Sequence, residues 1–209
     1  MVTGFFARGC LLGFCIAAPV GPIGVLCLRR SLTQGWLPGL VTGLGAATAD
    51  ALYGAVAGFG LTSISTFLVR QTFWLGLVGG LFLCRMGWGI LRSEPRPIEA
   101  GGAPGAAGLA GAYCSTVLLT LSNPMTILSF VAAFAGLGLG VGVDFPAAAA
   151  LVAGVWVGSA AWWLLLSAGA GWFRDRLRGG AGRWINRLSG LVILGFGVWL
   201  LGRLAFAGR

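Results

Sequence analysis

Six long apolar stretches divide this sequence, and they constrain its fold more than any motif does. A hydrocarbon core about 30 Å thick is spanned by roughly 20 apolar residues in an α-helix. The stretches cover residues 5–28, 39–60, 73–91, 110–138, 147–168 and 186–206. Hydrophobic residues make up 57% of the chain and charged residues only 9%, which is too little charge for a soluble or disordered chain. The sequence therefore predicts an all-α integral membrane protein with six transmembrane helices.

The arginines, which are the only basic side chains, gather on one side of the predicted membrane. Nine of the 14 fall in the connections that follow the first, third and fifth stretches. They are Arg29, Arg30, Arg92, Arg96, Arg174, Arg176, Arg178, Arg183 and Arg187, whereas the opposite side carries at most Arg8, Arg70, Arg203 and Arg209. Because arginine-rich connections stay in the cytoplasm, both termini are expected on the extracytoplasmic side.

The charge and cysteine content also limit the ligands. The net charge is +9, but the arginines are scattered between apolar stretches, which suits membrane lipid headgroups better than nucleic acid. The chain has no histidine, and its five cysteines form no CxxC pair and fall inside apolar stretches, so we expect them to be small buried residues. The sequence therefore predicts no nucleic-acid partner, no metal site and no cofactor.

Two segments of the chain are similar to each other, which indicates an internal repeat. WLGLVGGLFLCRMGWGIL (74–91) aligns with WINRLSGLVILGFGVWLL (184–201). Three pairs match at one constant offset, namely Trp74 with Trp184, Gly80 with Gly190 and Gly87 with Gly197. The alternative is a chance coincidence of glycine and tryptophan in apolar sequence.

The repeat predicts how the chain is organised. Residues 1–92 would form a first three-helix repeat and residues 109–209 a second, joined by a cytoplasmic linker over 93–108. Because three is an odd number, the second repeat must enter the membrane from the opposite side, so the two repeats are expected to be inverted.

Proline interrupts the first and fourth stretches at matching places. Pro19, Gly21 and Pro22 lie in the first stretch, and the pair Asn123-Pro124 lies in the fourth. Proline inside a helix removes a backbone donor and clashes with the preceding turn, whereas asparagine and proline suit the start of a helix. We therefore expect helices 1 and 4 to break into half-helices, whose restarting amino ends attract anions and line a substrate site. The alternative is a pair of proline kinks that bind nothing.

Asp50 lies near the centre of the second stretch, where a carboxylate is unfavourable enough to indicate a function. It could contact an ammonium group or carry a proton. Tyr53, one helical turn later, could share a cavity with Asp50, although an aromatic residue at this spacing more often packs. Arg85 lies at a similar depth in the third stretch, so it could form a direct ion pair with Asp50 and take part in coupling. The alternatives for Arg85 are that it extends to the cytoplasmic interface or is an isolated peculiarity.

These residues together resemble a known family. The run AAPVGPIGVLCLRRSLTQGWLPGLVTGLGAATADALYGAVAGFG (17–60) resembles the LysE/RhtB family of amino-acid exporters, through its P-x-G-P element, its glycine-rich second stretch, and its central Asp followed by Tyr. The third stretch, the Asn123-Pro124 pair and the run WVGSAAWWLLL (156–166) are also similar to that family. Arg85 departs from the apolar or aromatic residue expected at its position.

The resemblance implies a secondary transporter of the bacterial inner membrane rather than an enzyme. Such a protein would move amino acids or related small solutes out of the cytoplasm and would be coupled to protons. The resemblance also implies roles for the six motif residues that this sequence shares, namely Pro19, Gly21, Pro22, Asp50, Asn123 and Pro124. In the mechanism we expect, the half-helix ends hold a carboxylate, Asp50 handles the amino group or a proton, and the two repeats rock about the site.

Other function classes stay open at this point. A divalent metal-ion exporter is the closer rival, although Asp50 is the only central carboxylate and there is no histidine. A membrane thiol electron carrier would need a cysteine at each break, whereas Cys15 and Cys114 lie several residues away. A passive channel would need a continuous polar path. Faces rich in small residues can pack within one chain or between two chains of a homodimer.

Overall fold

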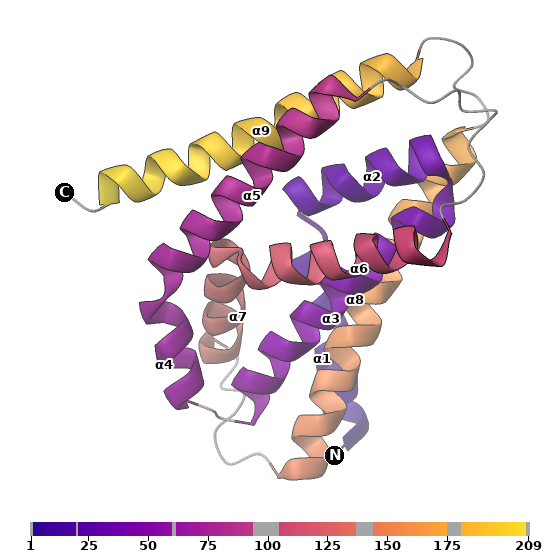
Figure 1. The fold of residues 1–209 in the computed structure, drawn as a ribbon. Coiled ribbons are helices and arrows are strands. Elements are labelled where there is room, and N and C mark those ends of the chain that lie inside the picture. The colour runs from indigo at the N-terminus through magenta and orange to yellow at the C-terminus, as the bar shows by residue number, and fades with distance from the viewer. Residues whose placement is uncertain are drawn as a thin grey trace.

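The fold is all-helical in the part of the chain that the computed structural model describes, which is residues 2–19, 21–59, 62–93, 105–136, 144–174 and 181–207. No strand occurs in these ranges. The helices, drawn in Figure 1, are α1 (Val2–Ala17), α2 (Pro22–Gln34), α3 (Trp36–Gly58), α4 (Thr62–Arg70), α5 (Thr72–Arg92), α6 (Ala106–Leu121), α7 (Pro124–Gly136), α8 (Phe145–Arg174) and α9 (Ala181–Ala207).

Four of these helices are long and apolar enough to cross a membrane, namely α3, α5, α8 and α9. Two further pairs pass the same test together but are bent, by 83° between α1 and α2 and by 63° between α6 and α7. The described part of the chain therefore has four helices that could each span a membrane, or up to six candidate spans if each bent pair is one span. Most of the predicted linker over 93–108 lies outside the described residues.

Several boundaries differ from the sequence prediction. Helix α9 begins at Ala181 and not at residue 186, so Arg183 and Arg187 lie in a helix and not in a connection. The short helix α4 was not predicted, and α8 extends beyond residue 168 to Arg174. The first predicted span ends at residue 28, but α2 continues to Gln34, so Arg29 and Arg30 lie in a helix and not in a connection. Gly35 then joins α2 to α3 directly, with a φ of 105° that favours glycine.

Small residues allow the longest helices to pack closely. On α1, a Cβ added at Gly9 or Gly13 would meet the backbone carbonyl of Leu151 or Val155 on α8. Gly158 on α8 in turn lies against the carbonyl of Cys10. Such contacts replace the hydrophobic driving force that is missing between helices in lipid.

The helices α5 and α9 form a second close pair and lie side by side in Figure 1. An added Cβ at Gly87 would lie 2.9 Å from the carbonyl oxygen of Gly190, and one at Gly197 would lie 3.0 Å from that of Gly80. As the residue number rises along α5 it falls along α9, so the two helices are antiparallel.

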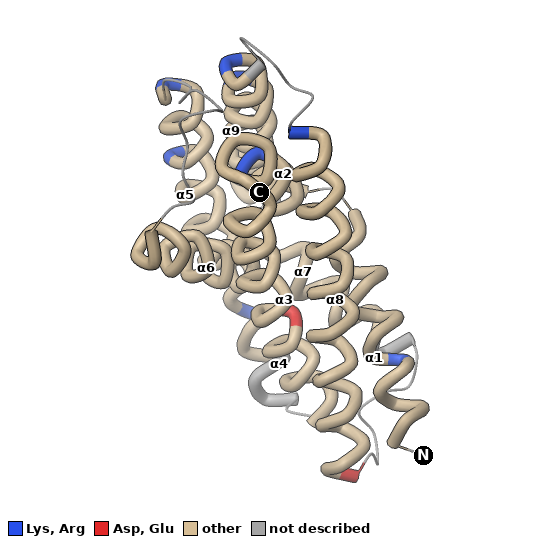
Figure 2. The backbone as a smooth tube through the Cα atoms, turned by 90° about the vertical axis from the view of Figure 1, so that its right-hand side faces the viewer, with Lys and Arg blue, Asp and Glu red and all other residues tan. Residues whose placement is uncertain are grey.

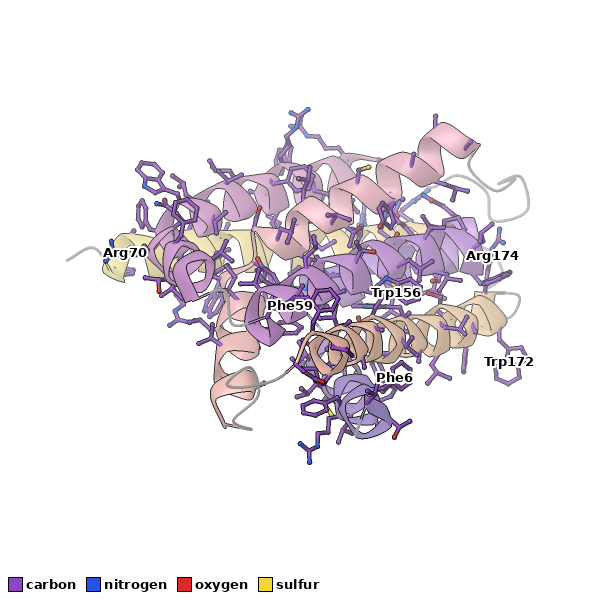
Figure 3. The ribbon with its side chains drawn as sticks, turned by 90° about the horizontal axis from the view of Figure 1, so that it is seen from below. Phe6, Phe59, Arg70, Trp156, Trp172 and Arg174 are labelled. Atoms are coloured by element: carbon purple, nitrogen blue, oxygen red, sulfur yellow. The ribbon has the colours of Figure 1, made fainter. Side chains whose placement is uncertain are left out.

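The outer surface is apolar, as expected for contact with lipid. Seen from below in Figure 3, the side chain of Trp172 projects away from the bundle, and Phe6 on α1 is also exposed. Figure 2 shows basic residues at the end of the molecule where α5 and α8 end and α9 begins, and others on α1 and α4. This composition and surface support the prediction of an integral membrane protein.

Candidate functional site

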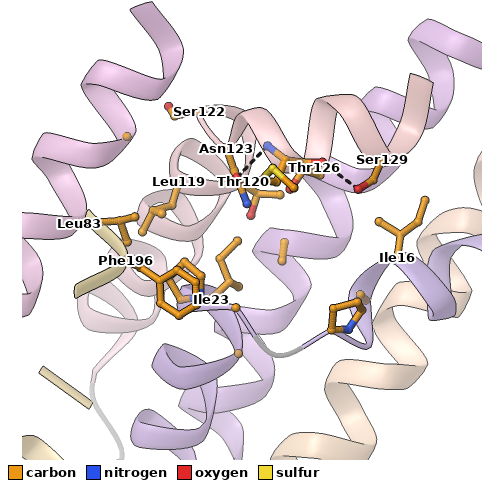
Figure 4. A pocket seen from close by; sticks show the side chains of 18 of the residues that line it. Ile16, Ile23, Leu83, Leu119, Thr120, Ser122, Asn123, Thr126, Ser129 and Phe196 are labelled. Atoms are coloured by element: carbon orange, nitrogen blue, oxygen red, sulfur yellow. Dashed lines mark hydrogen bonds between the residues drawn. The ribbon is translucent and has the colours of Figure 1, made fainter. Parts of the chain in front are cut away.

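A cavity of about 450 Å³ lies where the break between α1 and α2 meets the break between α6 and α7. Figure 4 shows side chains from both breaks around it, with Thr120 and Asn123 on one side and Ile23 on another. The helices α3, α5, α8 and α9 complete the wall. Its described lining residues include Ile16, Pro19, Gly21, Pro22, Ile23, Gly24, Asp50, Gly79, Leu83, Thr120, Ser122, Asn123, Thr126, Ser129, Trp163, Phe196, Trp199 and Leu200.

Most of the predicted site residues meet at this cavity. Pro19, Gly21, Pro22, Asp50 and Asn123 all line it, although they are spread over more than 100 positions of the sequence. The sequence pattern therefore identified residues that the fold brings together.

Two predicted site residues, Tyr53 and Pro124, are not among the residues that line the cavity. The hydroxyl of Tyr53 donates a hydrogen bond of 2.6 Å to the carbonyl of Leu121, at the carboxyl end of α6. The ring of Tyr53 packs beside that of Phe130. Tyr53 therefore joins α3 to α6 and α7. This is a packing role, which its helical spacing from Asp50 suggests as the alternative to a place in the cavity. Pro124 is buried as the first residue of α7.

Asp50 is almost fully buried, with 3% of its surface exposed, and is held by a chain of hydrogen bonds from α8. The hydroxyl of Ser159 donates to the Oδ2 atom of Asp50 at 2.7 Å. The indole Nε1 of Trp163 donates to the hydroxyl oxygen of Ser159 at 3.1 Å. These bonds fix the position of the carboxylate on α3, and both Asp50 and Trp163 line the cavity.

The restarting ends of the two half-helices differ in how they are capped. Asn123 accepts a hydrogen bond of 3.1 Å from the backbone N–H of Met125 through its Oδ1 atom, so α7 begins with the cap that the sequence predicts. By contrast, no described side chain caps the amino end of α2, where Pro22 is the first helical residue. The amino end of α2 is therefore the better anion-attracting end of the two.

Arg85 lies apart from this site. Its side chain is exposed and lines a separate hollow with Phe82 and Trp88. No ion pair joins it to Asp50 in the described structure, where both side chains are placed. The direct Asp50–Arg85 pair, which was one of the readings of the sequence, is therefore absent.

Arg29 and Arg30 form a polar cluster that the sequence reading missed. The Nε atom of Arg29 donates to the Oδ1 atom of Asn186 on α9 at 2.9 Å. The Nη1 atom of Arg30 donates to the Thr42 hydroxyl at 2.7 Å and to the carbonyl of Ala112 on α6 at 3.3 Å. These bonds attach the carboxyl half of α2 to three other helices.

The cysteines do not form a thiol centre at the breaks. All five are free, and none of the described residues that line the cavity is a cysteine. Only Cys27 is fully buried, whereas Cys15 and Cys114 are exposed on the outer surface, so the expectation that all five are buried was wrong. Within the described ranges, no group of three or more His, Cys, Asp or Glu residues could hold a metal ion.

Two known proteins are similar in sequence to much of this chain. The chain is 27% identical to "Putative amino acid efflux protein YcgF" of Bacillus subtilis (strain 168) over 191 residues, which is 90% of this chain and 91% of that protein. It is 29% identical to "Uncharacterized membrane protein YahN" of Escherichia coli (strain K12) over 143 residues, which is 67% of this chain and 63% of that protein. No solved structure matches the chain significantly.

A family model matches the chain over a similar length. The model described as LysE type translocator matches residues 14–203, which includes both helix breaks, Asp50 and the helices that enclose the cavity. Such a match covers most of the chain, and it agrees with the resemblance of the P-x-G-P element and the central Asp. The chain therefore belongs to the LysE-type translocator family of membrane transporters.

Proposed function

We propose that this protein exports amino acids or related small solutes across the bacterial inner membrane by proton-coupled alternating access. The observation that carries the proposal is the cavity where two helix breaks meet, with the buried carboxylate of Asp50 in its wall. The Bacillus subtilis relative, which aligns with 90% of this chain, is named as an amino acid efflux protein, and this supports the proposal. A cavity of about 450 Å³ is within the usual range for sites that enclose small molecules.

The proposed mechanism treats the chain as two inverted repeats, residues 1–92 and 109–209. The glycines that match in the sequence support this symmetry, because they contact each other crosswise. Gly80 lies against Gly197, and Gly87 lies against Gly190. Reciprocal contacts of this kind are what a two-fold axis between α5 and α9 produces. The same symmetry relates two further pairs of helices. Helix α1 corresponds to α6 and helix α8 to α3, and α1 packs on α8 as α6 packs on α3.

In the proposed site, the substrate lies between Asp50 and the amino end of α2. Asp50 contacts the ammonium group of the substrate or a proton, and Ser159 and Trp163 fix its orientation. Gly21 and Pro22 form the uncapped amino end that attracts the carboxylate. Pro19, Asn123 and Pro124 shape the two breaks, and Tyr53 keeps α3 against the end of α6.

The proposed orientation places the arginine-rich end in the cytoplasm and both termini outside, following the positive-inside rule. Lipid headgroups would meet the exposed arginines at that end. Small-residue faces already pack within the chain at α1 with α8 and α5 with α9. A homodimer would use the remaining surface.

Filling the cavity tests whether it is the transport site. Thr126 lines the cavity, whereas Leu128 on the same helix is exposed and is not among its lining residues. We expect Thr126→Trp to lower counterflow of a radiolabelled amino-acid panel in proteoliposomes by at least about tenfold, because an indole occupies the substrate volume. Leu128→Trp, the matched control, should transport like the wild type.

The same proteoliposomes, tested with divalent cations, distinguish amino-acid export from the rival function of metal-ion export. If the wild type exchanges no amino acid but carries divalent cations, amino-acid export is wrong. If Thr126→Trp and Leu128→Trp both transport normally, the cavity is not the pathway.

Arg85 gives a separate test of coupling. Its side chain is exposed and lies outside the cavity, so Arg85→Gln should leave uptake driven by a pH gradient within about twofold of the wild type. The measurement is the initial rate in proteoliposomes, with and without the gradient. A selective loss of the gradient-driven rate would restore Arg85 to the coupling mechanism.

A further inference from the structure

The side chain of Thr120 is a buried polar group without a partner at the wall of the cavity. Only 2% of its surface is exposed, and its Oγ1 atom has no hydrogen-bond partner in the described part of the chain. Thr120 lines the cavity at the end of α6, beside the break (Figure 4). The backbone carbonyl of Thr120, by contrast, is used by the N–H of Asn123.

Other threonines in this protein show that the unpaired state is unusual. The hydroxyls of Thr42, Thr48 and Thr116 each donate to the carbonyl four residues earlier in their helix. This is the common arrangement for threonine inside a helix. Thr116 is one turn before Thr120 on the same helix and is also fully buried, so burial alone does not explain the difference. Buried polar groups are normally hydrogen-bonded, and one that is unpaired beside a cavity is available to bind a ligand there.

The charges of the cavity indicate which ligand this is. Asp50 is the only ionisable side chain among the described residues that line it. An amino acid with an uncharged side chain brings one ammonium group, which Asp50 can neutralise, and one carboxylate. A basic amino acid would bring a second cation and an acidic one a second anion, and neither has a charged partner in the wall. An unpaired charge away from water is strongly unfavourable.

The rest of the wall fits an apolar substituent. Leu83 from α5 and Phe196 and Leu200 from α9 form one part of the cavity, and Trp199 lies beside them. Three uncharged polar side chains, those of Thr120, Ser122 and Asn123, come instead from the break between α6 and α7. The cavity thus offers both a polar region for the backbone groups of an amino acid and an apolar region for its side chain.

We propose that the hydroxyl of Thr120 donates a hydrogen bond to the carboxylate of the substrate, and that the cavity selects amino acids with uncharged, apolar side chains. The uncapped amino end of α2, which includes Ile23 and Gly24 in the cavity wall, completes the carboxylate site. This inference rests on the proposed function, since it names the substrate class of the same site.

The role of Thr120 is tested with Thr120→Val, which keeps the shape of the side chain and removes only the hydroxyl. Its KM for leucine in proteoliposome counterflow should rise roughly tenfold, as expected for one lost hydrogen bond to a charged group. Its thermal unfolding temperature should not fall, because the lost hydroxyl had no partner in the protein. Thr116→Val, the matched control, should keep the wild-type KM and lower the unfolding temperature. Thr120→Ser should restore the KM.

The substrate class is tested with leucine, lysine and glutamate as labelled substrates of the wild type. We expect leucine counterflow to exceed that of the other two by at least about tenfold. Equal rates for lysine would overturn the selectivity, and an unchanged KM in Thr120→Val would overturn the role of Thr120, while both outcomes leave amino-acid export intact. If none of the three moves and no other amino acid does, the proposed function itself fails, and this inference fails with it.

Discussion

Replacing Asp50 with asparagine is expected to lower amino-acid counterflow by roughly a hundredfold without loss of folded protein. The substitution keeps the size of the side chain, and the amide oxygen can still accept the hydrogen bond from Ser159. What it removes is the negative charge, and losing a charged hydrogen bond to an ammonium group costs about 3 kcal/mol, which corresponds to that factor. The measurement is the initial rate of leucine counterflow in proteoliposomes at matched protein density.

The same variant separates substrate binding from proton coupling. If Asp50 carries the proton rather than the ammonium group, Asp50→Asn should exchange substrate normally and lose only the uptake driven by a pH gradient. Ser159→Ala is the control for orientation, because it removes one hydrogen bond to the carboxylate and keeps its charge. A several-fold decrease is expected there. Wild-type activity of Asp50→Asn in both assays would exclude Asp50 from the mechanism.

Introducing leucine at Gly158 is expected to prevent the native packing of α1 on α8. A Cβ at this position would meet the backbone of Cys10, and a backbone contact cannot be relieved by a change of rotamer. Such overpacking should destabilise the protein by about 3 kcal/mol or more. The measurement is the yield of monodisperse protein in detergent together with its thermal unfolding temperature.

Gly169→Leu is the matched control on the same helix. Nothing lies within 4 Å of a Cβ added there, and the residue is exposed. This variant should be obtained in wild-type yield and should transport. Equal behaviour of the two leucine variants would mean that α1 and α8 do not pack in this way.

The long helices could be predicted from the sequence because membrane-spanning helices depend on local hydropathy, which a sequence displays directly. The start of α7 could also be predicted, because Asn123 and Pro124 favour the first turn of a helix through local backbone geometry. Arg29 and Arg30 were placed in a connection because arginine is rare in membrane helices. In the structure the helix continues through them, since Thr42, Ala112 and Asn186 provide oxygen atoms for their guanidinium groups.

The partners of Asp50 could not be predicted in the same way. Ser159 lies in a run of small residues and carries no local signal that distinguishes it from a packing residue. Its role depends on which face of α8 meets α3, and that is set by tertiary packing around Gly43 and Gly54. The same holds for Thr120, whose unpaired hydroxyl becomes apparent only when its neighbours are known. Arg85 shows the opposite case. A depth similar to that of Asp50 suggested an ion pair, but the side chain of Arg85 is exposed and α5 packs mainly against α9.

The contacts of Arg29 and Arg30 affect the rate at which a transporter of this kind can change conformation. Both arginines are attached by neutral oxygen atoms, and neither forms an ion pair in the described part of the chain. Separating α2 from α6 and α9 would therefore break two hydrogen bonds, of Arg30 with Ala112 and of Arg29 with Asn186, and would leave no buried anion behind. Breaking an ion pair away from water would raise the activation barrier of each turnover much further. A carboxylate at position 186 would be expected to hold this end closed and slow the cycle.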